Sequence, residues 1–569
     1  MFSLGSIIKK KIKNHIYYYY VESKRINGKP KYVNQKYLGT AESLLKKLVS
    51  MDAPLQPRVL HSEVTEFGAV SLLYDIADRL GICKMIDDIS PKRKQGASTG
   101  EYILTAAIHR AVSPTSTNGL QEWYADTCLP MITGKRPNLY TPQNFWNNTC
   151  IPVESIDAME DAILRKVIGT YNIDTTHIIY DATNFFTYID TMQKCESAKR
   201  GHSKEKRNDL RIIGLSLMVS SDFSIPLLHE TYPGNRPDAK QFYIMMDKLK
   251  KRYESITGHK SDVTVVFDRG NNSEDNINFL EESDFPFHYV GGLKKNQAKE
   301  LYKIPSDEYV PLGTESLKGQ FAYRAEIEIY RRKVTALIVY NPELEKGQLQ
   351  GILINREKTT KKLLDLQQKL IHRANGKITK GKKPTKSSIT KKAEDILKVE
   401  YMKSIFHYEV IESKGHIYLT FASSDEALKQ LQEQELGKKV LFTDRSDFTN
   451  EEIVNAYRSA WHVESAFKQM KNIEHLRVRP VFHWTDEKIR VHIFTCILAY
   501  RLCCLLLKEL NNKGIHMSIN RLLNEMAGIK HVDTFFGDID KPEKVQSFTL
   551  GSELAQQVED LYQLKRKYS

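Results

Sequence analysis

Two short apolar runs, each followed by an acidic residue, organise the predicted core of this chain. The stretch His177–Phe185 is apolar up to Tyr180 and then carries Asp181, and the run Val263–Phe267 is followed by Asp268. Apolar runs of this length predict buried strands, and we expect each aspartate to end its strand. A carboxylate in that position costs free energy unless it is paired or binds a metal. The pattern therefore indicates a metal site.

A later helical stretch supplies a third acid. The Thr-Asn-Glu-Glu sequence at 449–452 is a capping box, and it predicts a helix that runs to about Lys471. Tyr457, Glu464 and Lys471 follow one another at intervals of seven residues, so they share one face of that helix.

Glu464 also shares its stripe with Trp461 and Phe467, and we expect it to point inward toward the sheet. Two aspartates on strands and a glutamate on a helix can hold two divalent metals, which is the chemistry of phosphodiester cutting and joining. Other acids lie mostly at strand edges or turns and rank lower as ligands: Asp174, Asp190, Asp209, Asp222 and Asp238.

Around these acids the pattern predicts an α/β fold with a mixed sheet and flanking helices. Strands are expected at 211–219 and 225–232, and helices at 238–250 and 274–280. A β-rich insertion is expected after them, with strands at 322–330, 333–340, 407–411 and 416–421 and a helix at 359–372. The lysine-rich segment 376–392 is expected to be a mobile loop, either solvated surface or a phosphate contact.

The N-terminal stretch predicts a hairpin, because β-prone runs at 16–21 and 31–38 flank Asn27-Gly28. Basic residues surround the turn, including Lys24, Arg25 and Lys29. They either contact DNA or form the exposed basic face of a small sheet. The mostly helical region from 60 to 170 is either a DNA-end-binding domain or a plain structural one, and further helices are expected at 487–510 and 519–526.

Composition narrows the class of protein. The net charge of +14 favours a polyanionic partner such as nucleic acid, although a merely basic soluble protein has the same charge. The seven cysteines lack paired spacing, which argues against a zinc ribbon or disulfide framework and fits a reducing cytoplasm. The apolar stretch 491–507 contains His492 and Arg501 and predicts a core helix, not a membrane span.

Together these patterns resemble the DDE transposases of bacterial insertion sequences, of the cut-and-paste kind with an RNase H-like core. The motifs that carry the resemblance are Tyr180-Asp181-Ala182-Thr183, Gly201-His202-Ser203-Lys204 with Arg207 and Asp209, Pro233-Gly234-Asn235, Phe267-Asp268-Arg269-Gly270, and the helix of Tyr457, Glu464 and Lys471 with Arg479-Pro480-Val481. The expected regions are a basic β-hairpin region at 1–58, a helical DNA-end-binding domain at 59–171, the core at 172–291 and 439–475, a β-rich insertion at 292–438 and a C-terminal helical region at 476–569.

The resemblance implies Asp181, Asp268 and Glu464 as catalytic and metal-binding residues for two Mg²⁺ ions, with Mn²⁺ as a substitute. It implies DNA contacts from the following residues: Tyr457, Lys471, Lys204, Arg207, Arg269, Lys24, Arg25 and Lys29. One position departs from the family's Tyr-Arg-Glu-Lys signature, because Ala460 stands where the arginine is expected. Arg458 points about 200° away around the helix and is a poor substitute.

The expected partner is double-stranded DNA, both the element ends and the target. A homodimer is expected to bridge two ends. The protein is expected in the bacterial cytoplasm, associated with the nucleoid and not with a membrane. Two alternatives stay open. An RNase H-like nuclease would cut without strand transfer. A catalytically silent protein derived from a transposase would only bind DNA.

Overall fold

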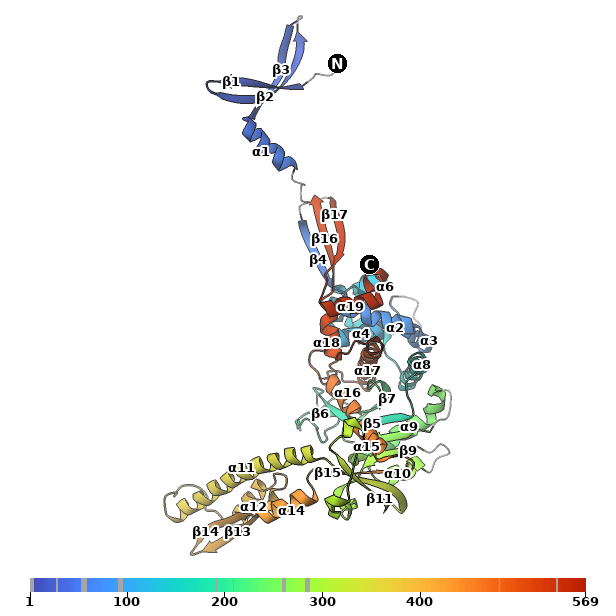
Figure 1. The fold of residues 1–569 in the computed structure, drawn as a ribbon, viewed down its shortest axis with the longest axis vertical. Coiled ribbons are helices and arrows are strands. Elements are labelled where there is room, and N and C mark those ends of the chain that lie inside the picture. The colour runs from blue at the N-terminus through green and yellow to red at the C-terminus, as the bar shows by residue number, and fades with distance from the viewer. Residues whose placement is uncertain are drawn as a thin grey trace. The chain divides into compact units, whose positions relative to one another are not determined.

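The computed structural model describes residues 5–26, 29–52, 59–90, 96–190, 192–207, 209–257, 262–281, 287–479, 481–538 and 541–568. The chain divides into two compact units (Figure 1). One unit comprises Met1–Thr65 with Lys530–Thr549, and the other comprises Glu66–Ile529 with Leu550–Ser569.

A nine-stranded mixed sheet forms the centre of the larger unit, with strand order β10-β11-β12-β15-β9-β8-β5-β6-β7. The strands are β5 (His177–Thr187), β6 (Arg211–Ser220), β7 (Pro226–Pro233), β8 (Thr264–Phe267), β9 (His288–Gly292), β10 (Val310–Pro311), β11 (Phe321–Ile329), β12 (Arg332–Tyr340) and β15 (Lys438–Thr443). Strand β5 pairs antiparallel with β6 and parallel with β8, and β8 pairs parallel with β9. The predicted α/β class with a mixed sheet is confirmed.

Strand β5 is longer than the sequence pattern indicates. Its parallel ladder with β8 stops at Tyr180 and Phe267, but its antiparallel ladder with β6 continues to Thr187 and Arg211. The prediction that Asp181 ends its strand is therefore wrong. The antiparallel neighbour keeps the strand extended, while Asp181 lies just past the end of the parallel pairing.

The larger unit also contains helices, some beside this sheet and some in a group above it (Figure 1). In chain order they are α2 (Gly68–Leu80), α3 (Ile82–Ile89), α4 (Thr99–Val112), α5 (Leu120–Ala125), α6 (Leu129–Thr133), α7 (Pro142–Asn148), α8 (Val153–Tyr171), α9 (Asp238–Thr257), α10 (Glu274–Glu281), α15 (Asn450–Arg458), α16 (Trp461–Met470), α17 (Asp486–Asn511), α18 (Ile519–Met526), α19 (Glu553–Tyr562) and α20 (Leu564–Lys567). Among the described residues α17 alone is long and apolar enough to cross a membrane, and 94% of its most apolar window is buried inside the protein.

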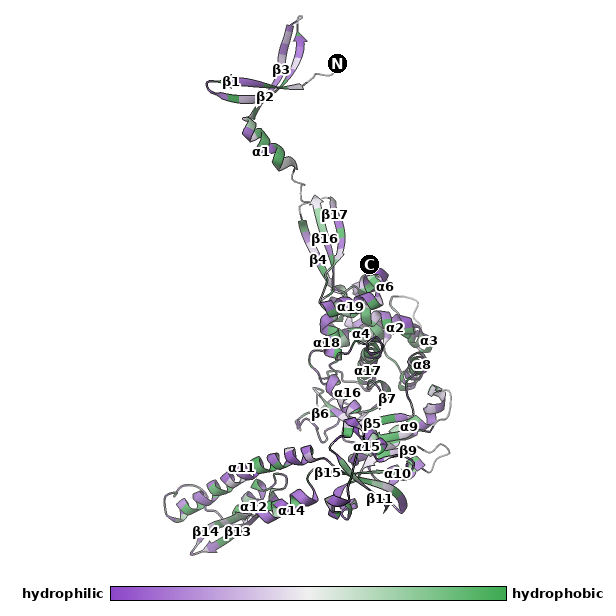
Figure 2. Ribbon diagram, in the orientation of Figure 1, coloured by the Kyte–Doolittle hydropathy of each residue, from purple (hydrophilic) through white to green (hydrophobic). Residues whose placement is uncertain are grey.

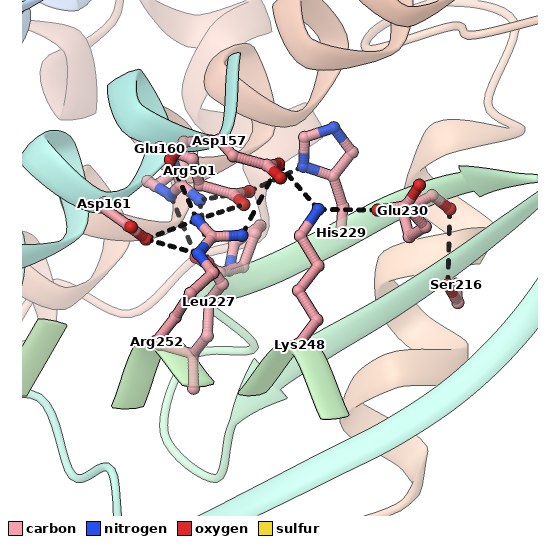
Figure 3. A network of polar contacts seen from close by, with 11 residues as sticks. Asp157, Glu160, Asp161, Ser216, Leu227, His229, Glu230, Lys248, Arg252 and Arg501 are labelled. Carbon is pink, nitrogen blue, oxygen red and sulfur yellow. Dashed lines mark hydrogen bonds and ion pairs between the residues drawn. The ribbon is translucent and has the colours of Figure 1, made fainter. Parts of the chain in front are cut away.

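A buried network of charges joins α8, α9 and α17 to β7 (Figure 3). The Glu160 carboxylate lies 2.6 Å from His229 Nδ1, 3.2 Å from Arg252 Nη2 and 3.5 Å from Arg501 Nη2. Burial alone would raise the pKa of Glu160, but these three groups hold it well below its usual range. Lys248 extends the network to Asp157 and Glu230, each at 2.6 Å.

Helix α4 carries a buried histidine whose pKa is lowered. His109 is 2% exposed, and its Nε2 lies 2.9 Å from the Thr115 hydroxyl. Burial, with a contribution from Arg110, lowers the pKa of His109 to about 3. The ring therefore stays neutral in the folded chain.

We expect the thermal midpoint of the protein to fall as the pH drops from about 6.5, the pKa of an unfolded histidine, toward 3. The sign follows because the unfolded chain binds a proton in this window and the folded chain does not. His109→Gln should remove part of this slope, and the exposed His416→Gln should not. Calorimetry at pH 7, 5.5 and 4 measures the effect, and parallel slopes in all three proteins would contradict it.

Strands β10, β11 and β12 come from the range 292–438 that we expected to be an insertion, yet they complete the main sheet. Between β12 and β15 lie α11 (Pro342–Ala374), α12 (Lys386–Ile396), α13 (Met402–Ile405), β13 (Phe406–Ser413), β14 (His416–Ser423) and α14 (Asp425–Gln434), which share an apolar core of their own. Helix α11 carries both hydrophilic and hydrophobic residues along its length (Figure 2).

The expected basic loop at 376–392 is only partly a loop. A capping box on Thr385 begins α12 at Lys386, and Ile389 and Ala393 are buried in the local core. Helix α11 begins at Pro342, well before the expected 359, because Asn341 caps it and proline suits the first helical position.

The smaller unit contains two three-stranded sheets. One consists of β1 (Gly5–Ile12), β2 (His15–Ile26) and β3 (Lys29–Gly39), followed by α1 (Ala41–Asp52). The predicted hairpin is confirmed by the pairing of β2 with β3, although Asn27-Gly28 lies outside the described residues. The other sheet combines β4 (Val59–Glu66), β16 (Lys530–Asp538) and β17 (Lys541–Phe548). The C-terminal range we expected to be helical thus contains two strands, because distant β4 offers them an edge to pair with.

Candidate active site

Asp181 and Asp268 lie side by side, each directly after the last paired residue of the parallel ladder between β5 and β8. Their preceding residues, Tyr180 and Phe267, are direct partners in the β5–β8 ladder. The Asp181 side chain is partly buried, and its Oδ1 accepts a hydrogen bond of 2.7 Å from the amide of Ala182. Burial raises the pKa of Asp181 to about 6, which Asp268 reinforces and Lys204 opposes. The two carboxylates are therefore electrostatically coupled.

Asp268 is exposed, and a tyrosine orients it. The hydroxyl of Tyr457, near the end of α15, donates a hydrogen bond of 3.0 Å to Asp268 Oδ1. This close approach needs Gly292 on β9, because a Cβ there would lie 2.9 Å from the Tyr457 oxygen. Burial and the adjacent Asp268 both raise the pKa of the Tyr457 phenol, so it remains a donor.

Glu464 lies on α16 and faces the same region. Burial lowers the pKa of Lys439, and the charges of Asp268 and Glu464 oppose that shift. Lys439 in turn lies 4.5 Å from the centre of the Tyr457 ring. Asp268 and Glu464 therefore both act electrostatically on Lys439 and on Tyr457.

The expected single helix is in fact two helices. It is interrupted at Ser459 and Ala460, where the backbone makes bonds to the third residue back, such as Ala460 N to Tyr457 O at 3.2 Å. Glu464 was expected to point inward toward the sheet, on a stripe with Trp461. It does line an open cleft together with Asp181 of β5, but it is exposed, and Trp461 is 57% exposed.

That cleft has a volume of about 910 Å³ and contains Asp181, Glu464 and two predicted DNA contacts, Lys204 and Lys471. The Lys471 ammonium donates to the Thr183 hydroxyl at 3.0 Å. Lys204 donates to the Ala182 carbonyl and lies 3.6 Å from Asp238, so it sits directly beside Asp181.

The other predicted DNA contacts lie elsewhere. Arg207 pairs with Asp209 at 2.9 Å, and Arg269 is exposed next to Asp268. Lys24, Arg25 and Lys29 are exposed on β2 and β3 of the smaller unit. Lys24 stands opposite Lys31 in that ladder, and like charges in such a pair are destabilising.

Arg458 does not take the role of the arginine missing at position 460. Its guanidinium donates to the Ser316 carbonyl at 3.0 Å and to the Gln320 side chain at 2.6 Å. The Arg458 side chain is therefore hydrogen-bonded to the segment before β11, away from the acids.

Three groups of the site escaped the sequence analysis. Lys439 is the second residue of β15, directly before its buried stretch, and that position was its only signal. Glu205 and Arg479 form an ion pair, and Glu205 also lies 3.7 Å from Lys471. Arg479 belongs to a motif quoted above and Glu205 directly follows another, but their pairing depends on segments far apart in the chain.

The donor set suits a hard divalent cation, because all three acids offer carboxylate oxygens. The raised pKa of Asp181 beside Asp268 fits a place where a cation would relieve repulsion. Among the residues that the structure describes, no three His, Cys, Asp or Glu side chains already stand close enough together to hold a metal ion. A metal would therefore have to draw the carboxylates together.

Removing the Tyr457 hydroxyl tests whether its hydrogen bond to Asp268 supports the site. We expect Tyr457→Phe to lower metal-dependent DNA cleavage about 10- to 100-fold, because partners that orient a ligand contribute that much. The control is Tyr418→Phe on β14, outside the cleft. Initial cleavage rates at saturating DNA measure the effect, and unchanged rates would remove Tyr457 from the site.

The family model described as the transposase DDE domain matches residues 173–502. A search of curated proteins gives no match. Among solved structures, the cryo-EM structure of the piggyBac transposase synaptic complex with hairpin DNA aligns at 10% identity and a TM-score of 0.37, over 81% of this chain and 78% of that one.

Proposed function

The chain belongs to the family of transposase DDE domains, and from that premise we propose that it cuts DNA at the ends of a bacterial insertion sequence and joins the freed 3′-OH to target DNA. The observation that carries the proposal is the pairing of Tyr180 with Phe267. Asp181 and Asp268 follow these paired residues directly, and Asp181 lines the same cleft as Glu464, which supports the proposal.

Asp181, Asp268 and Glu464 would hold the divalent ions, two Mg²⁺ with Mn²⁺ as a substitute. Bound there, the ions would activate the attacking oxygen and stabilise the leaving 3′ oxygen of an in-line displacement. The chain's own groups prepare the site. Tyr457 orients Asp268, and Lys204 favours the ionised form of Asp181.

Lys471 is proposed to hold a DNA phosphate at the cleft. Its ammonium is anchored by the Thr183 hydroxyl and offset by Glu205. An ammonium carries three donors, so it can bind a phosphate oxygen without giving up Thr183. Arg269 and Arg207 would extend this contact along the strand.

The strand order β7-β6-β5-β8-β9 supports an RNase H-like core, since three antiparallel strands are followed by two parallel ones. We also propose that the segment between β12 and β15 is the insertion, and that regions 1–58 and 59–171 bind the element ends. A homodimer would bridge two ends at the nucleoid in the cytoplasm.

The test uses the purified full chain and a DNA fragment that carries the flanking element end. With Mg²⁺ and a target plasmid, we expect a cut at the element end and joined products that need the free 3′-OH. Cutting without joining would favour a nuclease. Binding without cutting would favour the silent DNA-binding protein.

A further inference from the structure

A second cavity of about 700 Å³ lies in the larger unit, apart from the three acids. The connection after α4, the helix α7, the segment before α17 and the first turns of α17 enclose it. Four cations line it, namely Arg110, Arg477, Arg479 and Lys488, and no aspartate or glutamate of the described chain does.

Among the described residues, Arg479 alone of the four has an acidic partner, Glu205. Arg110 makes no hydrogen bond or ion pair through its side chain there, and Arg477 donates only to the carbonyl of Arg479, at 2.5 Å. Partly buried guanidinium groups without partners are costly. The cavity is therefore built for an anion.

The two histidines of the cavity add no positive charge to it. Burial, Arg110 and Lys488 lower the pKa of His483 to about 4. His492 is also held neutral, chiefly by burial, and its Nε2 bonds the Val478 carbonyl at 2.9 Å. Positive charge in the cavity thus comes from the arginines and the lysine.

Aromatic rings form another part of the wall. Lys488 lies 5.2 Å from the centre of the Trp146 ring. Phe482 and Trp484 are 61% and 56% exposed at the cavity, although large apolar side chains usually avoid water. Cations beside exposed aromatic faces are the combination that binds a phosphate together with a base.

Two ion pairs link a residue of this cavity to a residue of the catalytic cleft. Arg479 lines the cavity and pairs with Glu205, which lies 3.7 Å from the Lys471 ammonium in the cleft. The cavity and the catalytic cleft therefore lie close to each other in the larger unit.

We propose that this cavity takes one unpaired nucleotide of the DNA strand that passes through the catalytic cleft. Its phosphate would contact Arg110, Arg477 and Lys488, and its base would stack on Trp146 or Trp484. The inference rests on the proposed function, because it assumes DNA in the cleft.

Binding without divalent metal tests it. Fluorescence anisotropy would compare a blunt duplex, the same duplex with a three-nucleotide 3′ overhang, and an overhang that lacks bases. We expect the full chain to bind the natural overhang about tenfold more tightly than the blunt end. Trp484→Ala should bind the overhang with bases no more tightly than the overhang without bases. Arg477→Gln should lower the affinity for both overhangs about equally.

Arg490→Gln is the matched control, because it removes one cation from α17 at a different cavity, beside His229 and Glu230. A 5-iodouracil overhang should crosslink to Trp146 or Trp484 on irradiation. Equal affinity for blunt and overhang DNA, or wild-type affinity in both variants, would overturn the inference and leave the proposed function intact. No binding to any of the DNAs would overturn both.

Discussion

Asp268→Asn should lower the rate of end cleavage by at least about a hundredfold, while DNA binding remains close to that of the wild type. Asparagine keeps the size of the side chain and can still accept from Tyr457, so the fold is preserved. The change removes one of the negative charges that would hold a divalent ion. Groups that merely orient a ligand contribute 10- to 100-fold, so a ligand itself should contribute more.

The opposite end of the same strand provides the control. Asp262 precedes β8 as Asp268 follows it, and its carboxylate pairs at the surface with Arg445 and His288. Asp262→Asn removes the same charge from the same strand and should cleave at a rate near that of the wild type. Equal rates for the two variants, in a gel assay of end cleavage with Mg²⁺, would exclude Asp268 from the site.

Glu160→Leu should produce the largest loss of stability, about 3–5 kcal/mol. Arg501 is 1% exposed, and without Glu160 its hydrogen-bond partners are the carbonyls of Pro226 and Leu227 at 2.9 and 3.4 Å. His229 and Arg252 would lose a partner in the same place. A buried charge left without compensation costs much more than the intact pair contributes.

The thermal midpoint of the full chain measures this effect, and it should fall by several degrees. Asp247→Asn is the control, because its pair with Lys251 is exposed and such pairs contribute at most about 1 kcal/mol. A midpoint for Glu160→Leu within the range of that control would show that the network contributes little.

Local patterns predicted much of the architecture. The runs before Asp181 and Asp268 are apolar enough to be buried strands wherever they lie in the fold, and β5 and β8 are both present. The capping box at Thr449 begins α15 as expected, because it involves only four consecutive residues. The roles assigned to Asp181, Asp268 and Glu464 stay a prediction for the cleavage assay.

The remaining features depend on partners far apart in the chain. Strand β5 continues past Asp181 because β6 pairs with it, and strands β16 and β17 form where β4 offers an edge. Glu160, His229, Arg252 and Arg501 have no spacing that would relate them, yet they share one buried site.

The sequence by itself determined the chemistry available to this protein: three carboxylates on β-strand and helix patterns, and an excess of positive charge. The tertiary structure decided the arrangement, namely which strand ends lie side by side and which of the cations remain without acidic partners around the second cavity. The reason is physical. Hydrophobic periodicity and capping act over a few residues, whereas sheet pairing and charge compensation are set by whichever distant segment the fold brings into contact.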